Sequence, residues 1–228
     1  MTLSCATCPV RERAACAALN EKERAELARL GSHGVFERGE TVFAAGEDLD
    51  ACATLIEGLL KITHIDEQGS ERILSLVHPA GFVGEMFAPV ARHDVVALTT
   101  SRICRFPRRE YEAAVDRFPL LAQALLRRSA ADLYDARAQI ALDANRSATV
   151  KLATLIVALS HAASRSPCHG AAQFDLPLTR TEIAGMLGLT IETVSRQITR
   201  LEKDGVIARE GTRAIRIVDM DRLTDIAG

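Results

Sequence analysis

The stretch that most constrains this 228-residue chain is Leu178–Asp204, which predicts two short helices joined by a tight turn. Thr179 and Glu182 have the spacing of a capping box, which satisfies free backbone N–H groups where a helix starts. Gly188 can adopt the left-handed backbone with which many helices end. Apolar residues at steps of three and four predict one buried face per helix: Ile183, Ala184 and Leu187 in the first, and Ile191, Val194, Ile198 and Leu201 in the second.

The second of these helices, which Thr190 can cap, carries a polar face. Glu192, Ser195 and Arg196 are neighbours there and lie in its first turns. Arg can donate two hydrogen bonds to guanine, Glu can accept one from the cytosine amino group, and Ser can do either. A solvated helix face would also explain such charges, but the helix–turn–helix pattern favours contact with base edges in the major groove. We therefore predict DNA binding through Thr179, Thr190, Glu192, Ser195, Arg196 and Arg200.

Bulk properties limit how the chain can meet DNA. The formal net charge is −2, so the contact has to rest on a local basic patch, such as the mildly basic stretch Arg209–Arg222. The sequence has neither a signal peptide nor an apolar run of the ~18 residues that a membrane span needs. These features predict a cytoplasmic protein without a membrane partner.

The six cysteines of such a chain are expected to be thiols, metal ligands or redox groups rather than disulfides. Cys5, Cys8 and Cys16 lie close together at the N-terminus, and three clustered thiolates suit zinc or an iron–sulfur cluster. A redox-active dithiol is the alternative. A fourth ligand would have to come from Cys52, Cys104 or Cys168.

The middle of the chain predicts a helix over 20–30 and then a series of short strands separated by glycine-bearing turns. Many short strands at regular spacing indicate an antiparallel roll or barrel, which can enclose a small ligand. The expected strands are Val35–Phe36, Thr41–Phe43, Thr54–Glu57, Leu60–His64, Arg72–Val77, Val95–Leu98 and Ile103–Phe106.

A long helix is predicted over Pro119–Asp143. Leu126, Leu133 and Ile140 lie seven residues apart, and Ala136 falls between the last two at heptad spacing, which is typical of a coiled-coil seam. We expect these four residues to form a homodimer interface; packing against the chain's own roll is the alternative.

The remaining segments complete an α+β scheme. A helix over Ser147–Ala163, a loop over Ser164–Phe174 and a two-stranded wing over Val206–Arg209 and Ala214–Val218 surround the helix–turn–helix. The predicted organisation is a cysteine-rich segment (1–19), an antiparallel β-roll like those that bind cyclic nucleotides (20–117), a dimerisation helix (118–144) and a winged helix–turn–helix domain (145–228).

This order of elements resembles the family of bacterial regulators that includes the cyclic-AMP receptor and the fumarate–nitrate-reduction regulator (CRP/FNR). The specific marks are the segments Leu189–Arg196, Asp66–Arg72 and Pro79–Gly84. The oxygen-sensing branch looks closest, because it has an N-terminal C-x2-C-x7-C pattern and a later cysteine in the strand before the dimer helix. Cys5, Cys8, Cys16 and Cys104 match these positions.

The resemblance implies that these four cysteines hold a [4Fe–4S] cluster at low oxygen, which favours a dimer on a site resembling TTGAT-N4-ATCAA. Glu192, Ser195 and Arg196 would read each half-site. RNA polymerase would be a further partner, with the turn Glu67–Gly69 as a family-level candidate for the contact.

The sequence departs from the family pattern at two places, which bear on cyclic-nucleotide binding and on dimerisation. Members that bind cyclic nucleotides pair a Gly-Glu with a later Arg-Ser or Arg-Thr; Gly84-Glu85 is present here, but Ala91–Ala97 lacks the second pair, which argues against cyclic AMP. In oxygen sensors an acid on the dimer helix often opposes association without the cluster. Here Ala136 occupies the seam, with Asp132 and Asp135 near it.

Other sensors would suit the same DNA-binding dimer. Haem could use His33, His64, His78 or His93, thiols could act without metal, and zinc could have a purely structural role. An enzyme is not expected, because the sequence has no nucleophile–base constellation or phosphate-binding glycine loop, and Glu85 lacks an evident catalytic partner.

Overall fold

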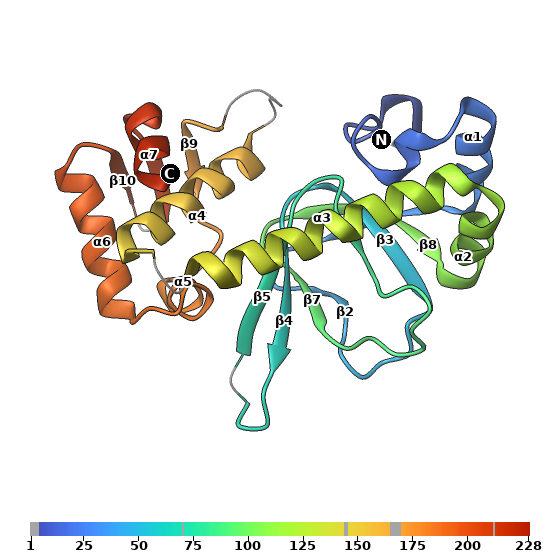
Figure 1. Cartoon of the computed structure of the whole chain (residues 1–228), viewed down its shortest axis with the longest axis horizontal. Helices are drawn as coiled ribbons and strands as arrows, with labels where there is room; N and C mark the ends of the chain where they lie inside the picture. Colours follow the sequence, from blue (N-terminus) through green and yellow to red (C-terminus); the bar gives the residue numbers. More distant parts are fainter. Residues whose placement is uncertain (1–4, 70, 144–145, 165–169, 212) are drawn as a thin grey trace. The chain divides into compact units, whose positions relative to one another are not determined.

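The computed structural model describes residues 5–69, 71–143, 146–164, 170–211 and 213–228, without the side chains of 135 and 138–143. The chain forms two compact units, Met1–Ala136 and Arg137–Gly228, which are described separately (Figure 1). No described helix combines the length and apolar character that crossing a bilayer would require.

The N-terminal unit begins with two short 3-10 turns, η1 (Cys5–Thr7) and η2 (Ala15–Ala18), and the helix α1 (Glu21–Leu30). Eight strands follow, and then come the helix α2 (Arg108–Arg117) and the start of α3 (Pro119–Asp143). The strands are β1 (Ser32–Phe36), β2 (Thr41–Phe43), β3 (Ala51–Glu57), β4 (Leu60–Ile65), β5 (Glu71–Val77), β6 (Phe82–Val83), β7 (Asp94–Ala97) and β8 (Ser101–Pro107).

These strands form two antiparallel four-stranded sheets, in the orders β1-β8-β3-β6 and β2-β7-β4-β5. Apolar side chains from both sheets fill the space between them, which confirms the predicted antiparallel roll. This core consists of Phe43, Leu49, Ala51, Ala53, Leu55, Leu60, Val77, Val83, Ala91, Val95, Ala97 and Ile103.

Strand β3 is buried along both faces, because alternate side chains of a strand point to opposite sides. Ala51, Ala53 and Leu55 enter the core between the sheets. Cys52 and Ile56 point to the outer face, where the N-terminal segment and α2 cover them. The outer face of β3 and β8 is therefore a second apolar surface, and the thiol groups collect there.

Helix α2 was not predicted from the sequence. It buries Tyr111 and Ala114 in one apolar cluster with Leu27 of α1 and with Phe118 and Leu121, which lead into α3. Phe118 alone separates it from α3, which begins at Pro119, as expected because proline suits the first turn of a helix.

Helix α3 spans Pro119–Asp143, as predicted. Leu121 and Leu125 are buried against the N-terminal unit, whereas Leu126 is 70% and Leu133 51% exposed. Ala136 is also exposed, and the side chain of Ile140 lies outside the described residues. The predicted seam is thus solvent-accessible within one chain wherever it is described.

The C-terminal unit contains α4 (Ala148–Ala163), α5 (Arg180–Leu187), α6 (Ile191–Lys203) and α7 (Met220–Ala227). Strands β10 (Ile207–Glu210) and β11 (Ala214–Ile217) form the predicted wing, but β9 (Gln173–Asp175) adds a third strand in the order β10-β11-β9. The prediction of a loop through Phe174 was therefore wrong at its end. Phe174 is buried and pairs with Ile215, so tertiary packing makes this short segment a strand.

Candidate functional site

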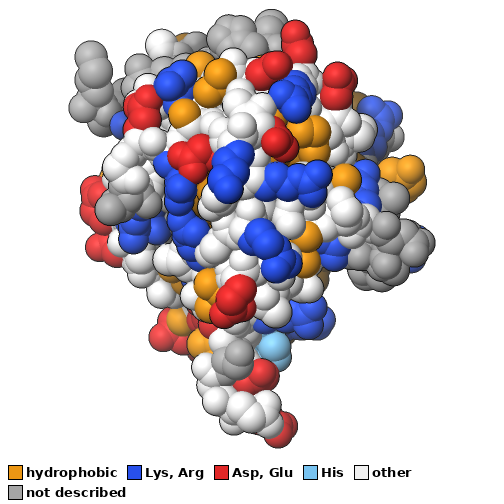
Figure 2. All heavy atoms as spheres, turned by 90° about the vertical axis from the view of Figure 1, so that its left-hand side faces the viewer, with side chains coloured by type: hydrophobic (Ala, Val, Ile, Leu, Met, Phe, Trp, Pro, Cys, Tyr) orange, Lys and Arg blue, Asp and Glu red, His pale blue; other side chains and the backbone are white. Residues whose placement is uncertain are grey.

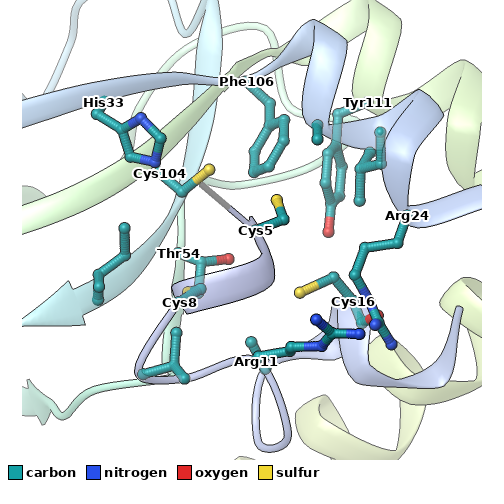
Figure 3. Close-up of a pocket in the computed structure, with 15 residues that line it drawn as sticks. Cys5, Cys8, Arg11, Cys16, Arg24, His33, Thr54, Cys104, Phe106 and Tyr111 are labelled. Carbon is teal, nitrogen blue, oxygen red and sulfur yellow. The ribbon is translucent and has the colours of Figure 1, made fainter. Parts of the chain in front are cut away.

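One pocket of the N-terminal unit is lined by the thiols of Cys5, Cys8, Cys16 and Cys104 (Figure 3). Cys5 lies on η1, Cys16 on η2 and Cys104 on β8, so three separate pieces of backbone supply the side chains. The pocket encloses about 610 Å³ of space, including its opening to solvent. The structure thus brings together the four cysteines that the resemblance singled out.

The N-terminal segment reaches this pocket by folding back in a compact turn. The Arg11 N–H donates to the Cys8 carbonyl at 3.1 Å, and the Ala14 N–H donates to the Val10 carbonyl at 2.9 Å. Val10 and Ala14 are buried against Ile56, on the outer face of β3. Apolar burial therefore fixes the backbone between the second and third cysteines.

Cys104 is positioned by the sheet. It lies between His33 of β1 and Thr54 of β3 in an antiparallel register, and its side chain shares the outer face with theirs. Gly31 packs closely against this side chain: a Cβ there would lie 2.9 Å from the Phe106 ring and 3.3 Å from the Cys104 sulfur. The missing Cβ leaves space for the Cys104 thiol beside the pocket.

The four thiols influence one another electrostatically. The pKa of the Cys104 thiol is raised to about 12, chiefly by burial and then by the nearby thiols of Cys5, Cys16 and Cys8. Burial also raises the pKa of Cys16, with further contributions from Cys8 and Cys5, and Arg24 opposes this rise. Four thiolates in this pocket would repel one another, so a cation or a positively charged metal group would stabilise the ionised set.

The donor set fits a soft metal group. Thiolate sulfur suits zinc and iron–sulfur clusters. In the part of the chain that the structure describes, no three His, Cys, Asp or Glu side chains converge where a single metal ion would sit. The four sulfurs instead surround a cavity with Val10, Ile56 and Phe106 in its wall. Four sulfur donors around one cavity are the set that a thiolate-bound metal group would require.

The other two cysteines do not join this set in the structure. Cys52 is 0% exposed and packs with Phe106 and Tyr111, beside the pocket but outside its lining. Burial, and then the charge of Glu112, raise the pKa of the Cys52 thiol to about 12. Cys168 lies outside the described residues.

The histidines considered for haem are spread over different places. His33 lines the thiol pocket, and His64 and His93 meet edge-on with their ring centres 6.1 Å apart. His78 is neither in the pocket lining nor in that pair, and burial lowers its pKa.

The helix–turn–helix follows the predicted local geometry. Thr179 and Glu182 form the capping box of α5, Gly188 ends this helix with φ 63°, and Thr190 caps α6 by accepting the Thr193 N–H. Val194, Ile198 and Leu201 bury one face of α6. Ile191, however, is 44% exposed; its predicted burial was wrong because the first turn of α6 projects from the core.

The opposite face of α6 presents the predicted DNA-contacting side chains. Figure 2 shows Lys and Arg side chains gathered on the side of the molecule that carries α6, with acidic groups among them. Glu192, Arg196 and Arg200 are exposed, and Ser195 is half-buried. Hydrogen bonds from its own N–H and from the Thr190 hydroxyl lower the pKa of Glu192, so this carboxylate is an ionised acceptor at neutral pH.

Arg180 is a site residue that the sequence reasoning missed. Its guanidinium donates to the Ser195 hydroxyl at 2.9 Å and so orients this side chain. A basic side chain at the first position after the Thr179 cap is the sequence signal that could have identified it. Most arginines of the predicted basic stretch Arg209–Arg222 already have partners within the protein. Arg209 pairs with Glu202, Arg216 pairs with Glu210, and the Arg222 guanidinium donates to the Asp204 carbonyl.

Comparisons with known proteins agree with both parts of the structure. Residues 34–118 match the model of the cyclic nucleotide-binding domain, and residues 150–226 match that of the Crp-like helix-turn-helix domain. The chain is 36% identical to the transcriptional activator protein FnrL of Cereibacter sphaeroides over 98% of its own length and 92% of the relative's. The chain belongs to the CRP/FNR family. It is a DNA-binding regulator of transcription with this family's helix–turn–helix.

Two further CRP/FNR proteins illustrate the similarity. The transcriptional activator protein Anr of Pseudomonas protegens is 31% identical over 84% of this chain and 79% of its own length. The solved structure of FixK2 from Bradyrhizobium japonicum superposes with a TM-score of 0.74, at 22% identity, over 87% of this chain and 98% of that one. The FixK2 comparison supports the fold alone.

The raised thiol pKa values predict how the metal-free protein reacts. Because only the thiolate is nucleophilic, iodoacetamide should alkylate Cys104 about tenfold faster for each pH unit between about pH 8 and 10 in the reduced, folded chain. In urea the increase should level off near the ordinary thiol pKa of 9.0. Mass spectrometry of pulse-labelled peptides measures both rates, and a plateau near pH 9 in the folded chain would contradict the raised pKa of Cys104.

Proposed function

We propose that this protein is an oxygen-responsive transcription activator whose [4Fe–4S] cluster is held by Cys5, Cys8, Cys16 and Cys104. The observation that carries the proposal is the meeting of these thiols, from three separate segments, around one apolar-walled pocket. Two of its relatives, FnrL and Anr, are named as transcriptional activators, which supports the role in activation. The cytoplasm, where DNA is accessible and thiols stay reduced, suits this function.

When bound, the cluster would supply an oxygen-labile link between the N-terminal segment and the sheet. Residues that line the pocket also pack against the start of α3. Phe106 and Tyr111 line the pocket with their ring centres 5.0 Å apart, and both belong to the buried cluster that holds Leu121 and Leu125 of α3. A change in how the pocket wall packs would therefore bear on the start of the long helix.

We infer that α3 forms the interface of a homodimer. Leu126 and Leu133 expose apolar surface at a spacing of one heptad, and Ala136 adds a small residue beside them. Ile140, whose side chain is outside the described residues, would extend the same seam. A cluster that favours the dimer-competent conformation would shift the monomer–dimer equilibrium toward the DNA-binding form.

In the dimer, Glu192, Ser195 and Arg196 would read each half of a palindrome resembling TTGAT-N4-ATCAA. Arg200 and the capping residues Thr179 and Thr190 would contact DNA around them. RNA polymerase would be the second macromolecular partner, reached through the turn Glu67–Gly69 between β4 and β5.

A cyclic nucleotide is not part of this proposal. Glu85, which is half of the family's nucleotide-binding signature, accepts a hydrogen bond from the Arg92 N–H at 3.3 Å. Its carboxylate also lies 3.3 Å from the Arg92 guanidinium and 3.5 Å from His93. These interactions hold Glu85 within its own loop.

The ligand assignment is tested by paired cysteine variants. Replacing Cys104 by Ser should prevent stable cluster assembly, because a hydroxyl is a poor ligand for iron at this position. Replacing Cys52 by Ser should leave iron content near that of the wild type, since Cys52 does not line the pocket. Iron and acid-labile sulfide per chain, measured after anaerobic reconstitution, give the answer. If only the Cys52→Ser protein loses iron, then Cys52 is the fourth ligand and the assignment of Cys104 is wrong.

The DNA-reading role is tested with two arginine variants of α6. Arg196→Ala should weaken binding to the palindrome by about 10- to 100-fold and remove discrimination against a site with its guanine changed. Arg200→Ala, the matched control, should weaken binding to both sites equally and lower the salt slope by about one. Fluorescence anisotropy at several salt concentrations measures these constants. Discrimination that survives in Arg196→Ala would refute the assignment.

A further inference from the structure

Arginine side chains approach the thiol pocket on the side of Cys16. Arg11, from the N-terminal turn, and Arg24, from α1, both line the pocket (Figure 3). The Arg24 guanidinium donates to three backbone carbonyls: that of Cys16 at 3.2 Å, that of Ala17 at 3.4 Å and that of Leu19 at 2.8 Å. One side chain of α1 thus holds the backbone that carries the third cysteine.

This backbone is packed through buried Leu19 and partly buried Ala15 and Cys16, but the turn itself is weakly capped. The turn η2 has four residues, its N-cap position is Ala14, and no side chain caps it. A short 3-10 turn has poor hydrogen-bond geometry and free carbonyls at its end. The forked guanidinium group of Arg24 donates hydrogen bonds to these carbonyls. The start of α1 is in turn fixed by the capping box of Asn20 and Glu23.

The two arginines differ in the charge that they present. Arg11 pairs with Glu21 at 2.7 Å and with Glu12 at 3.4 Å, which partly neutralises it. The partners described for Arg24 are uncharged carbonyls, so this group keeps its positive charge. Four thiolates or an anionic thiolate-bound cluster would gain electrostatic stabilisation from such a half-buried cation.

We propose that Arg24 is a positioning residue of the thiol pocket, which fixes the backbone of Cys16 and supplies the positive charge facing the ionised sulfurs. The proposal rests on the function proposed above, because the need for a cation follows from thiolate ligation. The hydrogen bonds of the Arg24 guanidinium and its positive charge can be tested separately in the reduced, metal-free chain of 228 residues.

The fork is tested by hydrogen exchange. The Leu19 N–H donates to the Cys16 carbonyl, so its exchange reports the order of this turn. In Arg24→Gln the amides of residues 15–19 should exchange about tenfold faster than in the wild type, because local opening becomes easier. Arg29→Gln, which removes an exposed arginine of the same helix outside the pocket lining, is the control and should leave exchange unchanged. Equal exchange in Arg24→Gln and the control would overturn the positioning role.

The charge is tested by comparing an anionic with a neutral alkylating reagent. Both attack the thiolate, so the ratio of the iodoacetate rate to the iodoacetamide rate at Cys16 reports the local electrostatic potential. Arg24→Gln should lower this ratio about fivefold, whereas Arg24→Lys, which keeps the charge, should hold it near the wild-type value. An unchanged ratio in Arg24→Gln would overturn the electrostatic role.

These measurements separate the inference from the function on which it rests. A wild-type chain that takes up no iron would contradict the proposed cluster, while faster exchange and a lower alkylation ratio in Arg24→Gln would still establish how Arg24 organises the thiols. A chain that binds iron but shows neither effect would leave the cluster in place and overturn the role of Arg24.

Discussion

The burial of both faces of β3 is the constraint on which the N-terminal unit depends. One face fills the core between the two sheets, and the other must be covered by something outside them. Residues 5–19 and α2 provide that cover, with Val10 and Ala14 packed on Ile56 at one end and Tyr111 beside Cys52 at the other. The thiols meet because apolar surface has to be removed from water at this place.

The same packing joins the pocket to the start of the long helix α3. Tyr111 contributes to the pocket lining and to the buried cluster at the start of α3. Leu121 and Leu125 attach the helix to the N-terminal unit, whereas Leu126 and Leu133 are exposed. A single helix therefore has one face buried against the N-terminal unit and another exposed to solvent. The proposed control of dimerisation by the pocket requires such a division.

Local chemistry explains which features were predictable from the sequence. The caps Thr179 and Thr190, the turn at Gly188 and the apolar steps of α6 act within a few residues, so spacing alone predicted the helix–turn–helix. Seven of the eight strands of the roll were likewise predicted from short β-type runs between glycines, whereas the two-residue strand β6 was missed. The predicted burial of Ile191 was wrong. Its place in the apolar periodicity did not reveal that the first turn of α6 is exposed.

Features that depend on distant packing were not predictable in this way. Cys52 and Cys104 lie on paired strands and share one face of the sheet, and spacing left both, with Cys168, as candidates for the fourth ligand. The resemblance to the CRP/FNR family singled out Cys104. In the structure Cys52 is kept out of the pocket lining because Tyr111 and Phe106 bury it. Strand β9 and helices α2 and α7 were missed for a similar reason, because each is short and packs against segments far away in the sequence.

The central claim is that four thiols hold an oxygen-labile iron–sulfur cluster. Its most direct test is the iron, acid-labile sulfide and visible absorption of anaerobically purified protein before and after exposure to air. We expect about four irons and four sulfides per chain and a brown colour that bleaches in air. Protein that contains no iron, and that cannot be reconstituted with iron and sulfide, would contradict it.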